Sequence, residues 1–252
     1  LTSLNLSNFD TSKVMDMYGM FYNTYNLTSL NLYNFDTSKV TDMGVMFAGM
    51  LILTSLNLSN FDTSKVTDMY GMFAYMHRLT SLNLSNFDTS NVTDMRGMFD
   101  GMSGLTSLDL SSFNTSKVIS MVAMFNGMSN LTALDLSSFD TSKVTDMSRM
   151  FFDTSNLATL DLSSFDTSNV TDMGAMFYLP YDDIPKDKLE KIYVNNDFNT
   201  TKLTDFSEMF TNRKKLRGGA GSYLIDPSTA DKTWLRIDDP AHGRPGYFTR
   251  KP

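Results

Sequence analysis

Two carboxylates, Asp62 and Asp68, stand six positions apart in the stretch "SNFDTSKVTDMYGMF" at residues 59–73. With the hydroxyl side chains beside them, they could bind a cation, exchange protons with a substrate or hold a backbone turn. Nearly the same stretch recurs along the chain, but the fifth copy has Asn114 and Ser120 in place of the two acids. Because a repeated ion site would keep its ligands in every copy, we interpret Asp62 as a turn residue and Asp68 as a residue at the start of a helix, and we expect no metal site.

The methionines are a second group that could do chemistry, because thioethers bind soft metals such as Cu(I). The chain has 20 of them, many at three- and four-residue spacing beside phenylalanine, as at Met72 and Met76. This spacing favours a packed core, where the flexible side chain fills gaps. Nucleophilic catalysis is poorly supported, since the chain has no cysteine and only two histidines, His77 and His242. We therefore expect neither an enzyme nor a bound cofactor.

A 26-residue repeat organises the chain. One phenylalanine recurs at this interval without a slip, and a leucine triplet accompanies each copy. An eighth, diverged copy follows a lengthening of seven residues and has Phe198 in the equivalent position. The seven regular phenylalanines are Phe9, Phe35, Phe61, Phe87, Phe113, Phe139 and Phe165.

Each copy divides into a strand, a corner and a helix. "LTSLNLS" alternates leucine with polar residues and predicts a short strand with one buried face. "NFDTS" predicts a corner, because its polar side chains bond to nearby backbone. "VTDMYGMFAYM" places apolar residues at three- and four-residue spacing, which predicts a short amphipathic helix with Thr67 as its N-cap and Asp68 at its start.

Such a unit cannot bury its apolar face alone, so the copies must stack. The predicted fold class is an α/β repeat: a leucine-rich-repeat solenoid of 26-residue rungs, each with a short parallel strand and a short helix. Its strands should form one parallel sheet along its length. We place the solenoid at residues 1–210 and a small C-terminal cap at 211–252, with "KTWLRI" and "GYFTR" as strands over the last rung. We interpret the basic run that begins at Arg213 as a solvated loop.

Charge and composition exclude several classes of protein. The first 180 residues hold 17 Asp and 8 Lys or Arg, a net charge of −9, whereas residues 181–252 hold 11 acids and 13 bases, a net charge of +2. A nucleic-acid-binding surface needs a basic stripe, so the acidic body argues against nucleic acid as a partner. No apolar run approaches the length of a membrane span, so we expect no membrane insertion.

The repeat resembles a known family. The pattern Leu-Thr-x-Leu-(Asn/Asp)-Leu-Ser-x-Phe-Asp-Thr-Ser-x-Val-Thr-Asp-Met-x-x-Met-Phe, which recurs in register over residues 1–210, is similar to that of BspA-like leucine-rich-repeat surface proteins. This variant is common in cell-wall-anchored proteins of lactic-acid and other Gram-positive bacteria. The stretch "RIDDPAHGRPGYFT" at 236–249 resembles the segment that closes such arrays. The resemblance implies adhesion to host mucus, epithelial or matrix components, an extracellular location with anchoring through regions outside this sequence, and no catalytic residues.

The central outward position of the predicted strands is the candidate ligand-binding surface. It is Asn in the first four copies, Asp109, Asp135 and Asp161 in the next three, and Tyr193 in the eighth. Three stacked carboxylates should raise one another's pKa, so we hypothesise that this half of the sheet binds acidic glycans better at acidic pH. The alternative is that Asn and Asp are interchangeable polar residues. Tyr33 and Tyr193 could stack on sugar rings, although isolated exposed aromatics are also ordinary.

The expected function is that of a monomeric bacterial cell-surface adhesin module. Its expected partners are a host mucin or other glycoprotein, or a matrix protein, bound through the exposed face of the sheet. Two alternatives remain: a passive spacer that projects another domain from the cell wall, and an intracellular protein-interaction scaffold.

Overall fold

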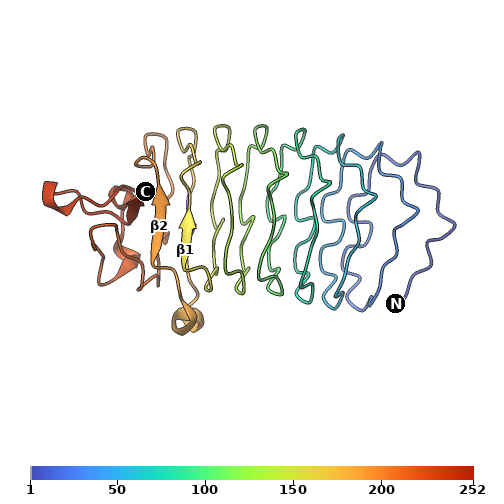
Figure 1. Ribbon diagram of the computed structural model, residues 1–252, viewed down its shortest axis with the longest axis horizontal. Helices are drawn as coiled ribbons and strands as arrows, with labels where there is room; N and C mark the ends of the chain where they lie inside the picture. Colours follow the sequence, from blue (N-terminus) through green and yellow to red (C-terminus); the bar gives the residue numbers. More distant parts are fainter. Residues whose placement is uncertain (1) are drawn as a thin grey trace.

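The chain folds into an elongated solenoid in which 26-residue rungs stack from one end to the other (Figure 1). The structure is a computed structural model and describes residues 2–252. The described residues contain three short strands and four 3₁₀-helices. They are β1 (Thr159–Asp161), η1 (Tyr181–Lys186), β2 (Lys191–Val194), η2 (Pro227–Thr229), η3 (Lys232–Trp234), η4 (Pro240–His242) and β3 (Phe248–Arg250). The predicted stacking of rungs is confirmed.

The core consists of columns of identical side chains that run along the solenoid. In one column the ring of Phe47 stacks on that of Phe73, with centroids 5.8 Å apart and planes 7° from parallel. All methionines are buried except Met15 and Met20 in the first rung, which confirms their predicted place in the core. The stacked column contains Phe21, Phe47, Phe73, Phe99, Phe125, Phe151, Phe177 and Phe210.

Where the sequence predicted a helix, the structure has a ribbon of consecutive turns. The N–H of Met72 closes a turn on the carbonyl of Met69 at 3.2 Å, whereas the N–H of Gly71 crosses to the carbonyl of Arg96 in the next rung at 2.8 Å. Gly71 has a φ of 55°, in the left-handed region. An α-helix requires bonds four residues back and right-handed backbone throughout, so the helix prediction is wrong.

The predicted helix start is a bridge between rungs. Both the N–H and the hydroxyl of Thr67 donate to the carbonyl of Thr41, at 2.8 and 3.2 Å, so Thr67 is no N-cap. Asp68 accepts the N–H of Tyr70 at 2.8 Å and forms a parallel bridge with Asp42. Equivalent bridges continue through every rung to Asp205. A ladder of backbone bridges therefore runs the length of the solenoid, through the Asp68 position of each rung and not through the leucine segments.

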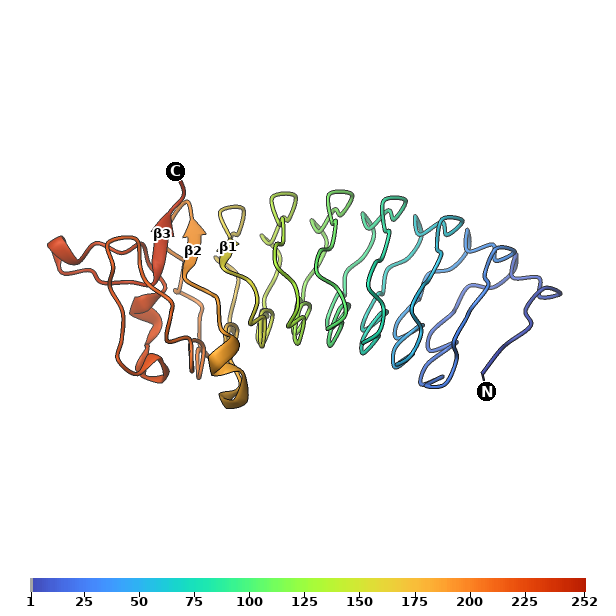
Figure 2. The same cartoon turned by 60° about the horizontal axis from the view of Figure 1, so that its bottom comes forward.

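The leucine segments form regular strands only near the C-terminal end; in earlier rungs the structure has single bonds, from the N–H of Thr28 to the carbonyl of Thr2 and from that of Thr132 to that of Thr106. There β1, β2 and β3 form a parallel sheet in that order, with Leu160 opposite Ile192 and Ile192 opposite Phe248. In the described structure, no backbone hydrogen bond joins the leucine segments at 53–59 and 79–85. Figure 2 accordingly draws strand arrows only at the C-terminal end. The prediction that leucine strands form one continuous sheet is therefore wrong.

Buried threonines hold the corners in register. The hydroxyl of Thr37 donates to the carbonyl of Asp62 at 2.9 Å and accepts the N–H of the same residue at 2.8 Å. These bonds satisfy two backbone groups inside the solenoid, where unpaired polar groups are costly. The column contains Thr11, Thr37, Thr63, Thr89, Thr115, Thr141 and Thr167.

The C-terminal end departs from the repeat. Strand β3 pairs with β2, as predicted for "GYFTR", but "KTWLRI" contains η3 in place of the predicted strand. Arg213 is fully buried and pairs with Asp187 at 2.8 Å, so the interpretation of the basic run as a solvated loop is wrong for this residue, whereas Lys214 and Lys215 are exposed. The helix η1 projects from the side of the solenoid just before the eighth rung (Figure 1).

Candidate ligand-binding face

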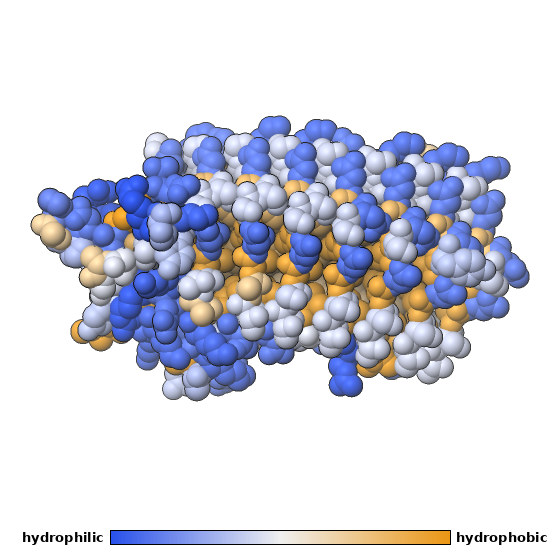
Figure 3. Space-filling view, in the orientation of Figure 1, coloured by the Kyte–Doolittle hydropathy of each residue, from blue (hydrophilic) through white to orange (hydrophobic). Residues whose placement is uncertain are grey.

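The leucine segments form one surface of the solenoid, which we call the leucine face. Figure 3 shows an apolar band along this side, bordered by hydrophilic residues. In the second to seventh copies the first and third leucines, such as Leu53 and Leu58, are buried, whereas the middle one is half-buried in most rungs. The half-buried members are Leu4, Leu30, Leu56, Leu82 and Leu134.

Hollows lie between neighbouring rungs on this face. One of about 350 Å³ is lined by the side chains of Leu30, Leu56 and Leu82 together with serines and the amides of Asn57 and Asn83. Because the adjoining segments form no backbone ladder, the space between them stays open to solvent. An apolar floor with a few amide groups at its rim is the usual lining of a ligand site.

The polar column beside these hollows keeps one geometry while its charge changes. The side-chain oxygen of Asn57 accepts the N–H of Ser59 at 3.0 Å, and that of Asp109 accepts the N–H of Ser111 at 2.9 Å. Asn and Asp therefore serve the same local turn. The column therefore differs along the solenoid only in its charge, which is neutral in the first four rungs and negative in the next three.

The expected rise in pKa of the stacked carboxylates is wrong. The N–H and hydroxyl of Ser111 hold the pKa of Asp109 below its ordinary value, and Ser137 does the same for Asp135. Burial raises the pKa of Asp161, but hydrogen bonds from Lys251 and Ser163 outweigh it. The three acids therefore stay ionised down to acidic pH, and binding favoured by acidification is not retained.

The structure brings together only some of the candidate site residues. Asp161 lies opposite Tyr193 across β1 and β2, and its carboxylate also pairs with Lys251 at 2.8 Å. Asp135 lies one rung before Asp161, and Asp109 one rung earlier. Tyr33 lies in the second rung, 69% exposed, where it lines a separate hollow of about 260 Å³. The two tyrosines therefore cannot contact one ligand ring together.

A further hollow, which was not predicted from the sequence, lies at the corner between the seventh and eighth rungs. It has a volume of about 220 Å³ and includes Phe165, Asn196 and Phe198 in its lining. The lengthening of the eighth copy could have indicated this hollow. Phe165 follows Leu162 by three positions, whereas Phe198 follows the equivalent Val194 by four.

Two other kinds of site have no support among residues 2–252. No three His, Asp or Glu side chains converge there as a metal ion would require. No helix of this part of the chain has both the length and the apolar character needed to cross a bilayer.

Comparison with known proteins gives a family. The chain matches no curated protein. Among solved structures it is similar to the functional domain of InlJ from Listeria monocytogenes, which includes a cysteine ladder, at 17% identity and a TM-score of 0.29. That match covers 85% of this chain and 49% of the other, so the chain spans about half the length of that structure. The family model described as "Mycoplasma protein of unknown function, DUF285" matches residues 1–103, 77–182 and 131–232, and the chain therefore belongs to the DUF285 family.

Proposed function

We propose that this chain is a non-enzymatic binding module of a bacterial surface protein, which adheres to host mucus glycoprotein or extracellular matrix through the leucine face. The observation that carries the proposal is the open hollows over the second to fourth rungs of that face, one of them floored by the half-buried Leu30, Leu56 and Leu82. The resemblance of the repeat to BspA-like surface proteins supports the cellular location and the class of partner.

The chemistry of the hollows suits glycoprotein. Leucine side chains at the floor pack against the C–H surfaces of a sugar or a peptide, and burial of that apolar area drives association. The amides of Asn57 and Asn83 both donate and accept hydrogen bonds, which matches the hydroxyl groups of a glycan. Stacked rungs repeat these groups along the solenoid, so an extended partner gains several weak contacts at once.

A glycan and matrix-protein array tests the proposal directly. The chain should bind mucin-type glycoprotein or a matrix protein, and to a similar extent at pH 5 and pH 7, because the carboxylates of Asp109 and Asp135 are ionised at both values. A passive spacer would give no binding at either pH. Binding that appears only at pH 5 would contradict the assignment of ionised carboxylates on the leucine face.

A further inference from the structure

The corner hollow arises from a single additional residue. In a regular corner a side chain closes the gap to the preceding rung: Asn60 donates to the carbonyls of Leu32 and Phe35, at 3.0 and 2.8 Å. The eighth rung has one residue more between Val194 and Phe198. The two corners therefore separate locally, although two bonds still join them: the Asn195 side-chain amide donates to the carbonyl of Ser163 at 3.1 Å, and the N–H of Asn199 donates to the hydroxyl of Thr167 at 2.8 Å.

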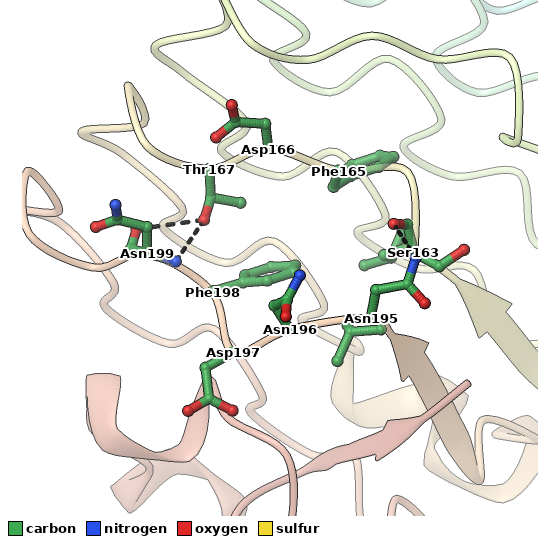
Figure 4. Close-up of a pocket in the computed structure, with 11 residues that line it drawn as sticks. Ser163, Phe165, Asp166, Thr167, Asn195, Asn196, Asp197, Phe198 and Asn199 are labelled. Atoms are coloured by element: carbon green, nitrogen blue, oxygen red, sulfur yellow. Dashed lines mark hydrogen bonds between the residues drawn. The ribbon is translucent and has the colours of Figure 1, made fainter. Parts of the chain in front are cut away.

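The separation uncovers an aromatic ring. Phe139, in the preceding rung, is 2% exposed, whereas Phe165 is only half-buried and lines the hollow. Figure 4 shows Phe165 and Phe198 on two sides of this space, with the amides of Asn195 and Asn196 beside it. The hollow therefore joins aromatic walls to amide groups, which supply both donors and acceptors.

The C-terminal segment holds the walls in place. The ring of Phe198 packs on that of Phe248 in β3, with centroids 4.6 Å apart. Asp197 accepts the N–H of Ile237 at 2.9 Å and forms an ion pair with Arg244. Because these contacts fix the inserted corner before any ligand arrives, the hollow is preorganised.

Charge and size narrow the class of ligand. Asp166 and Asp197 both line the hollow, and their carboxylates point away from the space between the rings (Figure 4). Two carboxylates at the rim, of which only that of Asp197 is paired with a cation, disfavour an anionic ligand. The volume of about 220 Å³ equals the share of roughly seven water molecules, which suits one ring better than a chain of rings.

We propose that this corner hollow binds a single uncharged sugar ring. The apolar face of the ring packs against Phe165, whose π-electrons attract its C–H groups. The hydroxyls of the sugar bond to the amide of Asn196 and to the side-chain oxygen of Asn195, whose Nδ2 donates to the carbonyl of Ser163. This inference rests on the proposed function only for the class of ligand, a glycan, and assigns a site separate from the leucine face.

Titration of the intact chain with soluble monosaccharides, followed by ligand-observed NMR, tests the site. Galactose or N-acetylglucosamine should bind to the wild type, and glucuronate should bind roughly tenfold more weakly. Phe165→Leu and Asn196→Ala should each weaken binding of the neutral sugar by roughly tenfold. Deletion of Asn196, which restores the regular corner length, should abolish it.

Phe139→Leu is the matched control, because it makes the same change in the same column at a ring that lines no part of the hollow. It should leave sugar binding unchanged. Equal losses in Phe165→Leu and Phe139→Leu, or equal affinity for neutral and anionic sugars, would overturn the assignment, as would a wild type that binds no monosaccharide. Failure of the proposed function is distinguishable with a variant that places charge on the leucine face, Asn57→Asp combined with Asn83→Asp. If only the corner hollow bound glycans, glycoprotein binding on the array would be lost in Phe165→Leu and unchanged in the leucine-face variant.

Discussion

Many polar side chains of the repeat bond to backbone nearby in their own rung, as Asp62 does, or to backbone of a neighbouring rung, as Thr63 and Asn60 do. Asp62 accepts the N–H of Ser64 at 2.9 Å, which agrees with its interpretation as a turn residue. The sequence could predict this role because Asp, Ser and Thr favour such bonds in turns. It could not predict that the buried hydroxyl of Thr63 bonds to the adjacent rung, because that bond depends on how the rungs stack.

The threonine column should contribute measurable stability. The Thr89 hydroxyl is buried, donates to the carbonyl of Asn114 at 2.9 Å and accepts its N–H at 2.8 Å. Thr89→Val keeps the shape but removes both bonds, so the free energy of unfolding should fall by about 1–3 kcal/mol, as measured by urea denaturation. Thr80→Val, the same change at an exposed threonine, is the control. Equal effects of the two substitutions would contradict the role of the column.

The carboxylates of the leucine face should titrate low. The N–H and hydroxyl of the serine two residues on stabilise the ionised forms of Asp109 and Asp135, so NMR should give each a pKa below 3.8. Since the folded pKa is depressed, the stability that each group adds is present above its unfolded pKa and is lost as pH falls through the folded value. A measured pKa above the ordinary value would contradict this prediction and support the hypothesis from the sequence, in which the stacked carboxylates raise one another's pKa.

At the scale of elements, the turn ribbon shows why periodicity alone misleads. Consecutive turns return the chain to the core after about the same number of residues as a helix, so Met69, Met72 and Phe73 are buried in either structure. What distinguishes the two is bonding between rungs, which no single copy encodes. Gly71 was one indication of left-handed backbone, because glycine favours that conformation. The indication was weak, because Ala123 and Arg149 occupy the equivalent position in later rungs.

The substitution Ala123→Gly distinguishes a turn ribbon from a helix, because it should change the free energy of unfolding in opposite directions in the two structures. Ala123 has a φ of 53°, a conformation that costs an alanine about 1 kcal/mol and a glycine little. The substitution should therefore raise the free energy of unfolding, or at least not lower it, in urea denaturation. In a helix the same change would lower that free energy by about 1 kcal/mol, and such a loss would contradict the turn ribbon.

At the scale of the whole molecule, the regular interval of 26 residues was sufficient to predict a solenoid, because every copy must stack on another. The irregular end was harder to predict. The buried pair of Arg213 and Asp187 joins residues on either side of the eighth rung, and Arg213 also donates to the carbonyl of Phe177 at 2.6 Å. In the sequence Arg213 is simply the first member of a basic run. The hollows of the leucine face could not be predicted either, because they form where the leucine segments of the early rungs do not pair as strands.

The junction beside η1 should make stability depend on pH. Burial raises the pKa of Asp153 to about 6, and Asp183 adds to the rise, whereas Arg213 and Lys186 oppose it. Because the folded pKa lies above the unfolded one, the contribution of this group is favourable at low pH and is lost as pH rises through about 6. Asp153→Asn should therefore match the wild type near pH 4 and exceed it in stability near pH 8, in urea denaturation at both values. A variant less stable than the wild type near pH 8 would contradict this prediction.

If the leucine face binds the partner, negative charge placed in its hollows should weaken binding. The substitutions must add this charge without disturbing the fold. Asn57→Asp combined with Asn83→Asp is suited to this, because Asp109 already forms the same turn as Asn57. The matched control, Asn114→Asp with Ser120→Asp, adds the same charge where other rungs carry Asp, outside the lining of the leucine-face hollows.

The measurement is the affinity of the three proteins for the same immobilised glycoprotein or matrix protein, by surface plasmon resonance. The leucine-face variant should bind roughly tenfold more weakly than the wild type, and the control should bind like the wild type. Equal affinity of all three proteins would contradict binding through the leucine face.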